Sequence, residues 1–235
     1  MSGREAPIAI IPARGRSKRL PQKNVALFKG KTLIDHTIVQ AMEAGFFGRI
    51  LVSSDDEEIL KIARKYPVEE YSRESGLAED NTPILEVLRH LIIRLDIAPE
   101  TVIGLLQVTA PLRTVNDIRM AYDLFKQSDQ RHAVVSVAPN EHPIHLSWRI
   151  ENNRLLPVFP ESYERSTRKQ DHVVTYYWND AVIFDLAHNL LQPDRNLFGK
   201  TPIPYVMEWE RSINIDYPFQ LELVQLLGEK ILKEE

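Results

Sequence analysis

The sequence predicts an α/β protein with a mostly parallel twisted sheet and helices on both faces. The first observation behind this prediction is an alternation of strand and helix patterns. Up to residue 138, short apolar runs bounded by polar or turn residues alternate with stretches whose apolar positions recur at the helical period. Such alternation builds parallel sheets from strand–helix–strand units. The second is size, because 235 residues with 43% apolar content can bury one substantial core.

The individual elements follow from the same patterns. The expected strands are Ile8–Pro12, Ile50–Ser53, Val102–Gln107 and Ala133–Val137, and the expected helices are Leu33–Ala44, Glu57–Lys65, Pro83–Leu95 and Val115–Gln127. The pairs Asp55-Asp56 and Asn116-Asp117 stand where helices should begin. Side chains of this kind can accept hydrogen bonds from the free backbone N–H groups of a first helical turn.

After Ala138 the rhythm changes. Residues 139–176 contain four prolines and several aromatic residues but no long helical pattern, which indicates an inserted, partly β segment. We expect a single domain over residues 1–235, with an insertion at about 139–177 that serves substrate closure, self-association or both. Two further core strands are expected at Val182–Phe184 and Ile203–Val206, and an amphipathic terminal helix at Phe219–Leu232.

Composition excludes several classes of protein. No stretch approaches the roughly 18 consecutive apolar residues of a membrane span, and the amino terminus lacks the apolar core of a signal peptide. The absence of cysteine excludes disulfides, thiolate metal ligands and a cysteine nucleophile. We therefore expect a cytoplasmic protein that has neither a membrane nor a nucleic acid as its partner.

The loop after the first strand concentrates positive charge. No Asp or Glu occurs from Ala6 to Ile34, although the whole chain has a net charge of −4. The basic residues of this loop are Arg14, Arg16, Lys18, Arg19 and Lys23. Ligands of open α/β sheets bind at the carboxyl ends of strands, and charge of one sign attracts an anion of the other. The loop therefore predicts a polyphosphate site, although an arbitrary run of charges is more often a solvated surface.

Two common phosphate-binding motifs are absent from this loop. The segment Gly30-Lys31-Thr32 looks like the end of a P-loop, but the motif requires a glycine at position 25, which is valine. A dinucleotide fingerprint needs three glycines after the first strand, and only Gly15 lies between Pro12 and Gly30. The polyphosphate site is therefore of neither conventional type.

Three other segments carry candidate functional side chains. Asn214 and Asp216 alternate along an extended segment, so their oxygens share a face and could hold Mg²⁺; helix capping by Asp216 is an equal alternative. Gln107 and Arg113 flank a turn after the third strand, and the planar guanidinium of Arg113 suits a carboxylate or phosphate. A turn of this sequence serves about as often only to cap the helix that follows it. The cluster at residues 168–171 is, by itself, more typical of a solvated loop.

Taken together, these segments resemble the cytidylyltransferases that activate nine-carbon keto-sugar acids: the CMP-N-acetylneuraminate synthetases and their legionaminic and pseudaminic acid counterparts. The most specific match runs from Ile10 to Asn24 and is similar to the nucleotide-binding signature of that family, with Arg16 in place of a second glycine. Further matches follow in the same order as in the family: V-S-S-D at 52–55, Arg73 with L-A-E-D-N-T at 77–82, Q-V-T-A-P-L-R at 107–113 and R-K-Q-D at 168–171.

The resemblance implies a site. The implied nucleotide-binding residues are Ala13, Arg14, Gly15, Ser17, Lys23, Asn24, Arg73 and Thr82, and the implied sugar-binding residues are Gln107, Arg113, Arg168, Gln170 and Asn179. Arg14 and Lys23 would hold the triphosphate, and Asp216 with Asn214 would hold Mg²⁺ as cofactor, so that catalysis would depend on Arg14, Lys23 and Asp216. The inserted segment would form the contact of a homodimer.

Two residues depart from the family pattern. The family usually has an Asp-x-Asp metal pair, but Asn214 replaces the first carboxylate here. The family usually has an Asn-Gly-Ala run, but Asp180 replaces its glycine. We expect the amide to weaken metal binding, because the pair loses one negative charge.

The expected reaction is transfer of CMP from CTP to the anomeric hydroxyl of a nonulosonic (sialic-type) acid, which yields a CMP-sugar and pyrophosphate. Two alternatives stay open. A related enzyme could use 3-deoxy-manno-octulosonate with CTP, or a sugar phosphate with GTP. A non-catalytic sugar-nucleotide binding subunit would explain why Asn214 replaces a metal-binding carboxylate.

Overall fold

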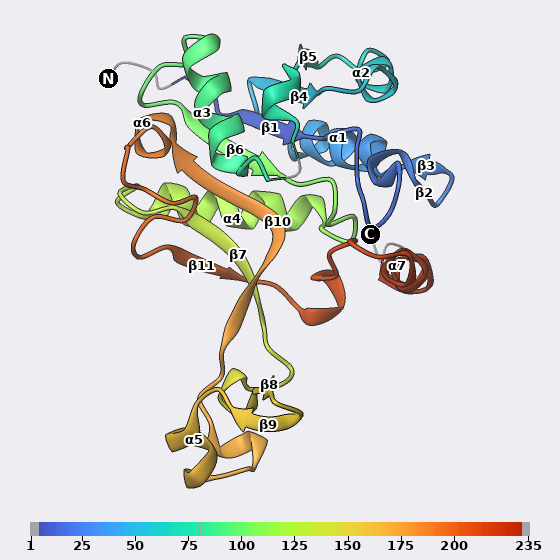
Figure 1. The fold of residues 1–235 in the computed structure, drawn as a ribbon. Helices are drawn as coiled ribbons and strands as arrows, with labels where there is room; N and C mark the ends of the chain where they lie inside the picture. The colour runs from blue at the N-terminus through green and yellow to red at the C-terminus, as the bar shows by residue number, and fades with distance from the viewer. Residues whose placement is uncertain (1–4, 80, 232–235) are drawn as a thin grey trace.

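The computed structural model describes residues 5–79 and 81–231, in which seven strands form a central sheet between two layers of helices (Figure 1). Its strands are β1 (Ile8–Pro12), β4 (Arg49–Ser54), β5 (Glu69–Ser72), β6 (Val102–Leu106), β7 (Val134–Pro139), β10 (Tyr176–Leu186) and β11 (Ile203–Val206), in the order β11-β7-β10-β6-β1-β4-β5. Only β10 is antiparallel to its neighbours among these strands. The predicted mostly parallel α/β fold is confirmed.

Both faces of the sheet are buried because neighbouring residues of each strand point to opposite sides. In β1, Ala9 and Ile11 contact one core and Ile8 and Ile10 contact the other. The first core also contains side chains of α1 (Leu33–Ala44), α2 (Glu57–Ala63), α4 (Val115–Gln127) and α7 (Pro218–Ile231). The second contains those of α3 (Ile84–Arg94) and α6 (Ala187–Leu190).

Helix starts follow local capping chemistry. Asp56 caps α2 as predicted, and its carboxylate accepts a hydrogen bond from the Glu58 N–H at 2.8 Å. The predicted bounds of α4 are confirmed, but its cap lies before the expected pair Asn116-Asp117: Thr114 is the N-cap, and Asp117 completes a capping box by accepting from the Thr114 backbone. The pattern S/T-x-x-D at positions 114–117 was the better signal, since a hydroxyl at N-cap pairs with an acid three residues later.

The central strand β10 is longer than predicted. β10 begins at Tyr176 rather than Val182, because its first residues pair with the end of β7. The register between the two strands shifts between Trp178 and Ile183, and Asp180 within this bulge has a φ of 59°. Bulges of this kind bend a strand and redirect its side chains.

Residues 140–175 leave the sheet between β7 and β10 and form an arm that projects from the body of the molecule (Figure 1). The arm contains an antiparallel hairpin of β8 (Trp148–Glu151) and β9 (Arg154–Pro157), followed by the short helix α5 (Pro160–Arg165). The arm is therefore partly β, as its prolines, its aromatic residues and its lack of a long helical pattern predicted. A second small hairpin, β2 (Leu27–Phe28) with β3 (Lys31–Thr32), follows the basic loop.

Within the described residues, no helix has the length and apolar character needed to cross a bilayer. Asp80, which belongs to the L-A-E-D-N-T segment that matches the family, lies outside the described residues.

The centre of the sheet gives a stability prediction. Gly104 in β6 leaves room for two rings, because a Cβ there would lie 2.8 Å from ring carbons of Phe47 and Phe184. We expect Gly104→Ala to lower the free energy of unfolding by about 1–3 kcal/mol through overpacking, measured by urea denaturation. Gly76→Ala is the matched control because a Cβ there meets nothing within 4 Å. Equal stability of the two variants would contradict the packing argument.

Candidate active site

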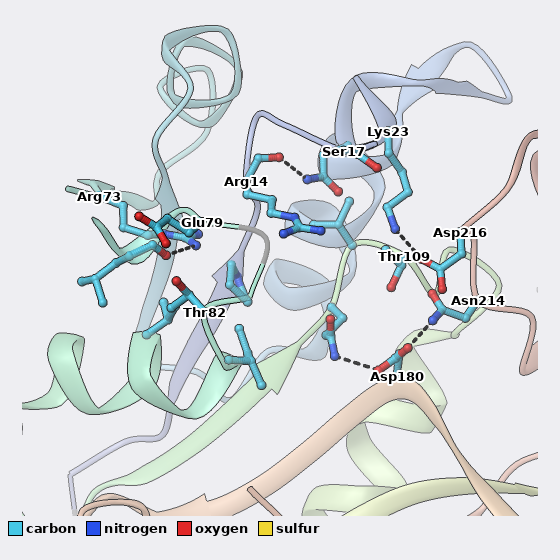
Figure 2. A pocket seen from close by; sticks show the side chains of 17 residues that line it. Arg14, Ser17, Lys23, Arg73, Glu79, Thr82, Thr109, Asp180, Asn214 and Asp216 are labelled. Carbon is cyan, nitrogen blue, oxygen red and sulfur yellow. Dashed lines mark hydrogen bonds and ion pairs between the residues drawn. The ribbon is translucent and has the colours of Figure 1, made fainter. Parts of the chain in front are cut away.

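A cleft of about 290 Å³ opens at the carboxyl ends of β1 and β6 (Figure 2). Five segments form its walls: the basic loop after β1, the segment from β5 into α3, the turn after β6, the bulge of β10 and the extended segment before α7. The predicted site residues that line it are Arg14, Ser17, Lys23, Asn24, Arg73, Thr82, Gln107, Asn214 and Asp216. Residues as far apart in sequence as Arg14 and Asp216 therefore share one cavity.

The basic loop is held in place by hydrogen bonds of its backbone groups to the Asn24 side chain and to the end of β4. The amide of Asn24 donates to the Arg14 carbonyl at 2.7 Å, which ties the two ends of the loop together. The Ala13 N–H donates to the Ser53 carbonyl, and the Gly15 N–H to the Asp55 carboxylate at 3.0 Å. A Cβ at position 15 would overlap the Asp56 side chain, so glycine is required there. Ala13 and Gly15 thus shape the loop without lining the cleft.

Opposite charges face each other across the cleft. The Lys23 ammonium lies 2.9 Å from one carboxylate oxygen of Asp216, and the Arg19 guanidinium lies 3.5 Å from the other. Of the two roles considered for Asp216, the geometry therefore favours a carboxylate that faces the cleft. Its backbone N–H donates to the Gln220 side chain at 2.7 Å, which orients the segment that leads into α7.

A second carboxylate stands next to Asp216. Asp180 accepts hydrogen bonds from the side-chain amides of Gln107, at 2.9 Å, and of Asn214 (Figure 2). Burial, reinforced by the negative charge of Asp216, raises the pKa of Asp180 to about 6, although Lys23 and the two amide donors act in the opposite direction.

The sequence prediction missed Asp180 as a site residue and noted it only as an absent glycine. A signal was present: relative to the family pattern, position 180 gains a carboxylate and position 214 loses one.

Several oxygens at this end of the cleft are suited to a divalent cation. Besides the carboxylates of Asp180 and Asp216, Asn214 Oδ1 and Thr109 Oγ1 are buried and have no hydrogen-bond partner in the described structure. Mg²⁺ prefers hard oxygen ligands, often one or two carboxylates together with substrate phosphates. Among residues 5–79 and 81–231, no group of three or more His, Cys, Asp or Glu could hold a metal by itself. The residues present fit a cation that shares its shell with a nucleotide.

The other end of the cleft is formed by the segment from Arg73 to Val87. Arg73 is nearly buried, and its guanidinium donates to the carbonyls of Ser53, at 2.6 Å, and Leu77, at 3.3 Å. Burial lowers its pKa. Figure 2 shows Arg73, Glu79 and Thr82 at this end, with Arg14 between them and the acidic end. The cleft thus has one end where Lys23 faces carboxylates and another end where the polar and charged side chains lie among apolar ones such as Leu77 and Ile84.

Arg113 does not line the cleft, contrary to the expectation of a direct substrate contact. Its side chain is completely buried and donates to the carbonyls of Gln107, at 3.1 Å, and Ala181, at 2.6 Å, and to the Gln40 side chain at 2.8 Å. Burial lowers its pKa to about 10. The five donors of a guanidinium allow it to connect three elements at once, so it positions the backbone on either side of Gln107 and Asp180.

Asn179 also differs from the expected sugar contact. It is buried, and its amide donates to the Ser212 hydroxyl at 2.9 Å, so it fixes the bulge of β10 to the segment that carries Asn214. Arg168 and Gln170 lie in the arm and do not line the cleft of the same chain. Arg168 is exposed and pairs with Asp171 at 3.9 Å.

The fold and this cleft define a nucleotidyltransferase. The first strand of its α/β sheet leads into a basic loop, and carboxylates at the edge of the sheet face this loop. The family model described as cytidylyltransferase matches residues 8–230, and the chain belongs to that family of enzymes. The prediction from sequence that this protein is a nucleotidyltransferase is thereby confirmed.

Individual relatives agree with this assignment. The chain is 31% identical to a pseudaminic acid cytidylyltransferase of Campylobacter jejuni over 94% of this chain and 95% of that protein. It is 30% identical to an N-acylneuraminate cytidylyltransferase of Escherichia coli over 95% of this chain and 52% of that protein. In fold it is similar to a solved CMP:2-keto-3-deoxy-manno-octonic acid synthetase complexed with CTP, with a TM-score of 0.66, 15% identity and coverage of 96% and 99% of the two chains.

The environment of Arg113 gives the prediction for this site. Arg113→Met keeps much of the side-chain volume but leaves three buried acceptors without their donor, so we expect the free energy of unfolding to fall by about 2 kcal/mol, measured by urea denaturation. Arg119→Met is the matched control, since exposed Arg119 also donates to two carbonyls, those of Ala44 and Glu43. If Arg113 served only to contact substrate, both variants would be equally stable.

Proposed function

We propose that this enzyme transfers CMP from CTP to the anomeric hydroxyl of a nonulosonic acid and releases pyrophosphate. One observation carries the proposal: the basic side chains of the loop after β1 face the oxygen ligands of Asp180, Asn214 and Asp216 across one cleft, with Lys23 only 2.9 Å from Asp216. A triphosphate would bind the cations on one side, and a divalent cation would bind the oxygens on the other. The substrates named for relatives at about 30% identity support a nine-carbon acid as acceptor.

The arrangement of the cleft suggests how the substrates would lie. Thr82 and the Arg73 segment would receive the cytidine, Arg14 and Lys23 the phosphates, and Gln107 the sugar acid at the acidic end. The anomeric hydroxyl would lose its proton to solvent as its oxygen attacks the α-phosphorus, and the bond between this phosphorus and the bridging oxygen of the leaving pyrophosphate would break. Because such transition states spread charge over phosphate oxygens, fixed cations accelerate the reaction mainly by electrostatic stabilisation.

We infer Mg²⁺ as the cofactor of this reaction. Asp216 and Asn214 are the residues that would hold it, together with oxygens of the triphosphate. A bound Mg²⁺ would neutralise charge on the phosphates and polarise the reacting oxygens. When CTP binds, Lys23 would exchange Asp216 for a phosphate, and this exchange would release the Asp216 carboxylate for the cation.

The reaction is tested by pyrophosphate release with each of the four nucleoside triphosphates, with Mg²⁺ or chelator. The acceptors are N-acetylneuraminic, legionaminic, pseudaminic and 3-deoxy-manno-octulosonic acids. We expect release that depends on Mg²⁺, CTP and one of the nine-carbon acids. Release with 3-deoxy-manno-octulosonic acid alone would contradict the proposed acceptor, release with GTP in place of CTP would contradict the proposed nucleotide, and CTP binding without release across the panel would contradict catalysis.

The phosphate-binding role of the loop gives a mutational prediction. Arg14→Ala and Lys23→Ala should each lower kcat/KM by about 100-fold or more, because each removes a cation from the developing charge. Lys31→Ala is the control, since it removes the same charge from exposed strand β3 outside the cleft. Steady-state kinetics measure the effect, and near-normal turnover in both cleft variants would exclude the proposed role.

We further infer that the enzyme works as a homodimer joined through the arm. The arm exposes large apolar side chains, among them Ile150, Leu155, Val173 and Val174, each at least 60% exposed. It also carries Arg168 and Gln170, which do not line the cleft of their own chain. An arm that packs against a second copy would bury this apolar surface and could bring Arg168 to the partner's sugar site.

Mixing two inactive variants tests this arrangement. Lys23→Ala and Arg168→Ala homodimers should each be weakly active, but a mixed dimer contains one cleft with both residues intact. After random subunit exchange we expect about a quarter of wild-type activity, measured by pyrophosphate release. Native mass spectrometry establishes that mixed dimers form, and their formation without recovered activity would refute a role for Arg168 across the interface.

A further inference from the structure

The two departures from the family pattern meet in space. Asp180, which stands in place of a glycine, accepts a hydrogen bond from the amide of Asn214, which stands in place of an aspartate. Replacing Gly and Asp by Asp and Asn leaves the number of carboxylates at these two positions unchanged. Together with Asp216, the site therefore has two carboxylates, as an Asp-x-Asp pair would provide.

The backbone explains how position 180 can supply a carboxylate. Its φ of 59° is in the left-handed region, where glycine is favoured but aspartate is among the better tolerated side chains. The bulge leaves this residue outside the regular pairing of β10 with β7, and Val182, two residues later, donates its N–H to the Ser136 hydroxyl at 2.8 Å. The side chain of Asp180 is thereby directed into the cleft rather than across the sheet (Figure 2).

The contacts of Asp180 also orient the neighbouring amide. Because Asn214 Nδ2 donates to Asp180, Asn214 Oδ1 is turned away from this contact and is buried without a partner in the described structure. An unpaired buried acceptor is costly, and a cation or donor that binds it would remove that cost. The second donor, Gln107, holds the other oxygen of Asp180 at 2.9 Å and so restricts the carboxylate.

We propose that Asp180 is the second carboxylate of the divalent-cation site, so that the negative charge missing at position 214 has moved to position 180. Asn214 contributes its amide oxygen and holds Asp180 through its amide nitrogen. This inference rests on the proposed metal-dependent reaction. It also removes the argument for a non-catalytic subunit, because Asn214 then marks a relocated carboxylate and not a lost one.

Metal affinity provides the direct test. Mn²⁺ binding is measured by electron paramagnetic resonance in the presence of CTP and without a sugar acid, so that no turnover occurs. Asp180→Asn should weaken Mn²⁺ binding by about 10-fold or more. Asp123→Asn is the control, because it removes the same charge from a half-exposed side chain on α4 that pairs with Lys126 outside the cleft. Unchanged affinity in Asp180→Asn would overturn the inference.

The exchange of residues provides a second, independent test. Asp180→Gly should weaken Mn²⁺ binding as Asp180→Asn does. Glycine suits the left-handed backbone conformation at position 180, so this variant should fold. Adding Asn214→Asp to Asp180→Gly should restore the affinity to within a few-fold of the wild type, because the carboxylate returns to the other position. A folded double variant with no recovery would contradict relocation.

The results distinguish a failure of the proposed reaction from a failure of the proposed role of Asp180. Wild-type protein that binds Mn²⁺ with CTP but releases no pyrophosphate with any acceptor would refute the reaction and leave the role of Asp180 intact. Wild-type protein with Mg²⁺-dependent release, in which Asp180→Asn alters neither Mn²⁺ affinity nor the Mg²⁺ concentration needed for half-maximal rate, would refute only the role of Asp180.

Discussion

The ion pair between Lys23 and Asp216 sets the arrangement of the site. It joins the basic loop to a segment 193 residues later in the chain, and both groups keep contact with solvent. An ion pair of this kind contributes little to stability, since exposure screens it. Its importance is electrostatic balance: each charge neutralises the other while the substrates are absent. A triphosphate and a cation would each replace one member of the pair, so the cleft is arranged for two ligands of opposite charge that bind together.

Buried polar residues that never reach the cleft hold the site in shape. Arg113 connects the turn after β6 to the bulge of β10 through two carbonyls, and Asn179 connects the same bulge to Ser212 near the segment that carries Asn214. The Ile215 N–H completes the set by donating to the Thr109 carbonyl at 2.8 Å. Three segments that are distant in sequence therefore keep fixed separations, which is the preorganisation that electrostatic catalysis requires.

The bulge of β10 combines two functions that a regular strand could not. Before the bulge, β10 pairs with β7 to form the base of the arm; after it, β10 pairs with both β6 and β7 within the sheet. The residue at the bulge, Asp180, faces the cleft. A movement of the arm would therefore act on the strand that carries Asp180, which places the predicted dimer contact and the predicted cation site on one continuous element.

The fold class, the bounds of several strands and helices and the positive charge of the loop after β1 could be predicted, because each depends on periodicity or composition within one contiguous segment. Helix α1 and strand β1 match their predicted bounds for this reason. Strand β5 was missed because Glu69–Ser72 carry no apolar run. The three-dimensional arrangement alone gives Arg113 and Asn179 their roles as buried supports, and it brings Asp216 to the basic loop and Asp180 into the same cleft. These roles depend on burial and on contacts between segments more than 30 residues apart, such as Asn214 with Asp180, and no local pattern encodes them.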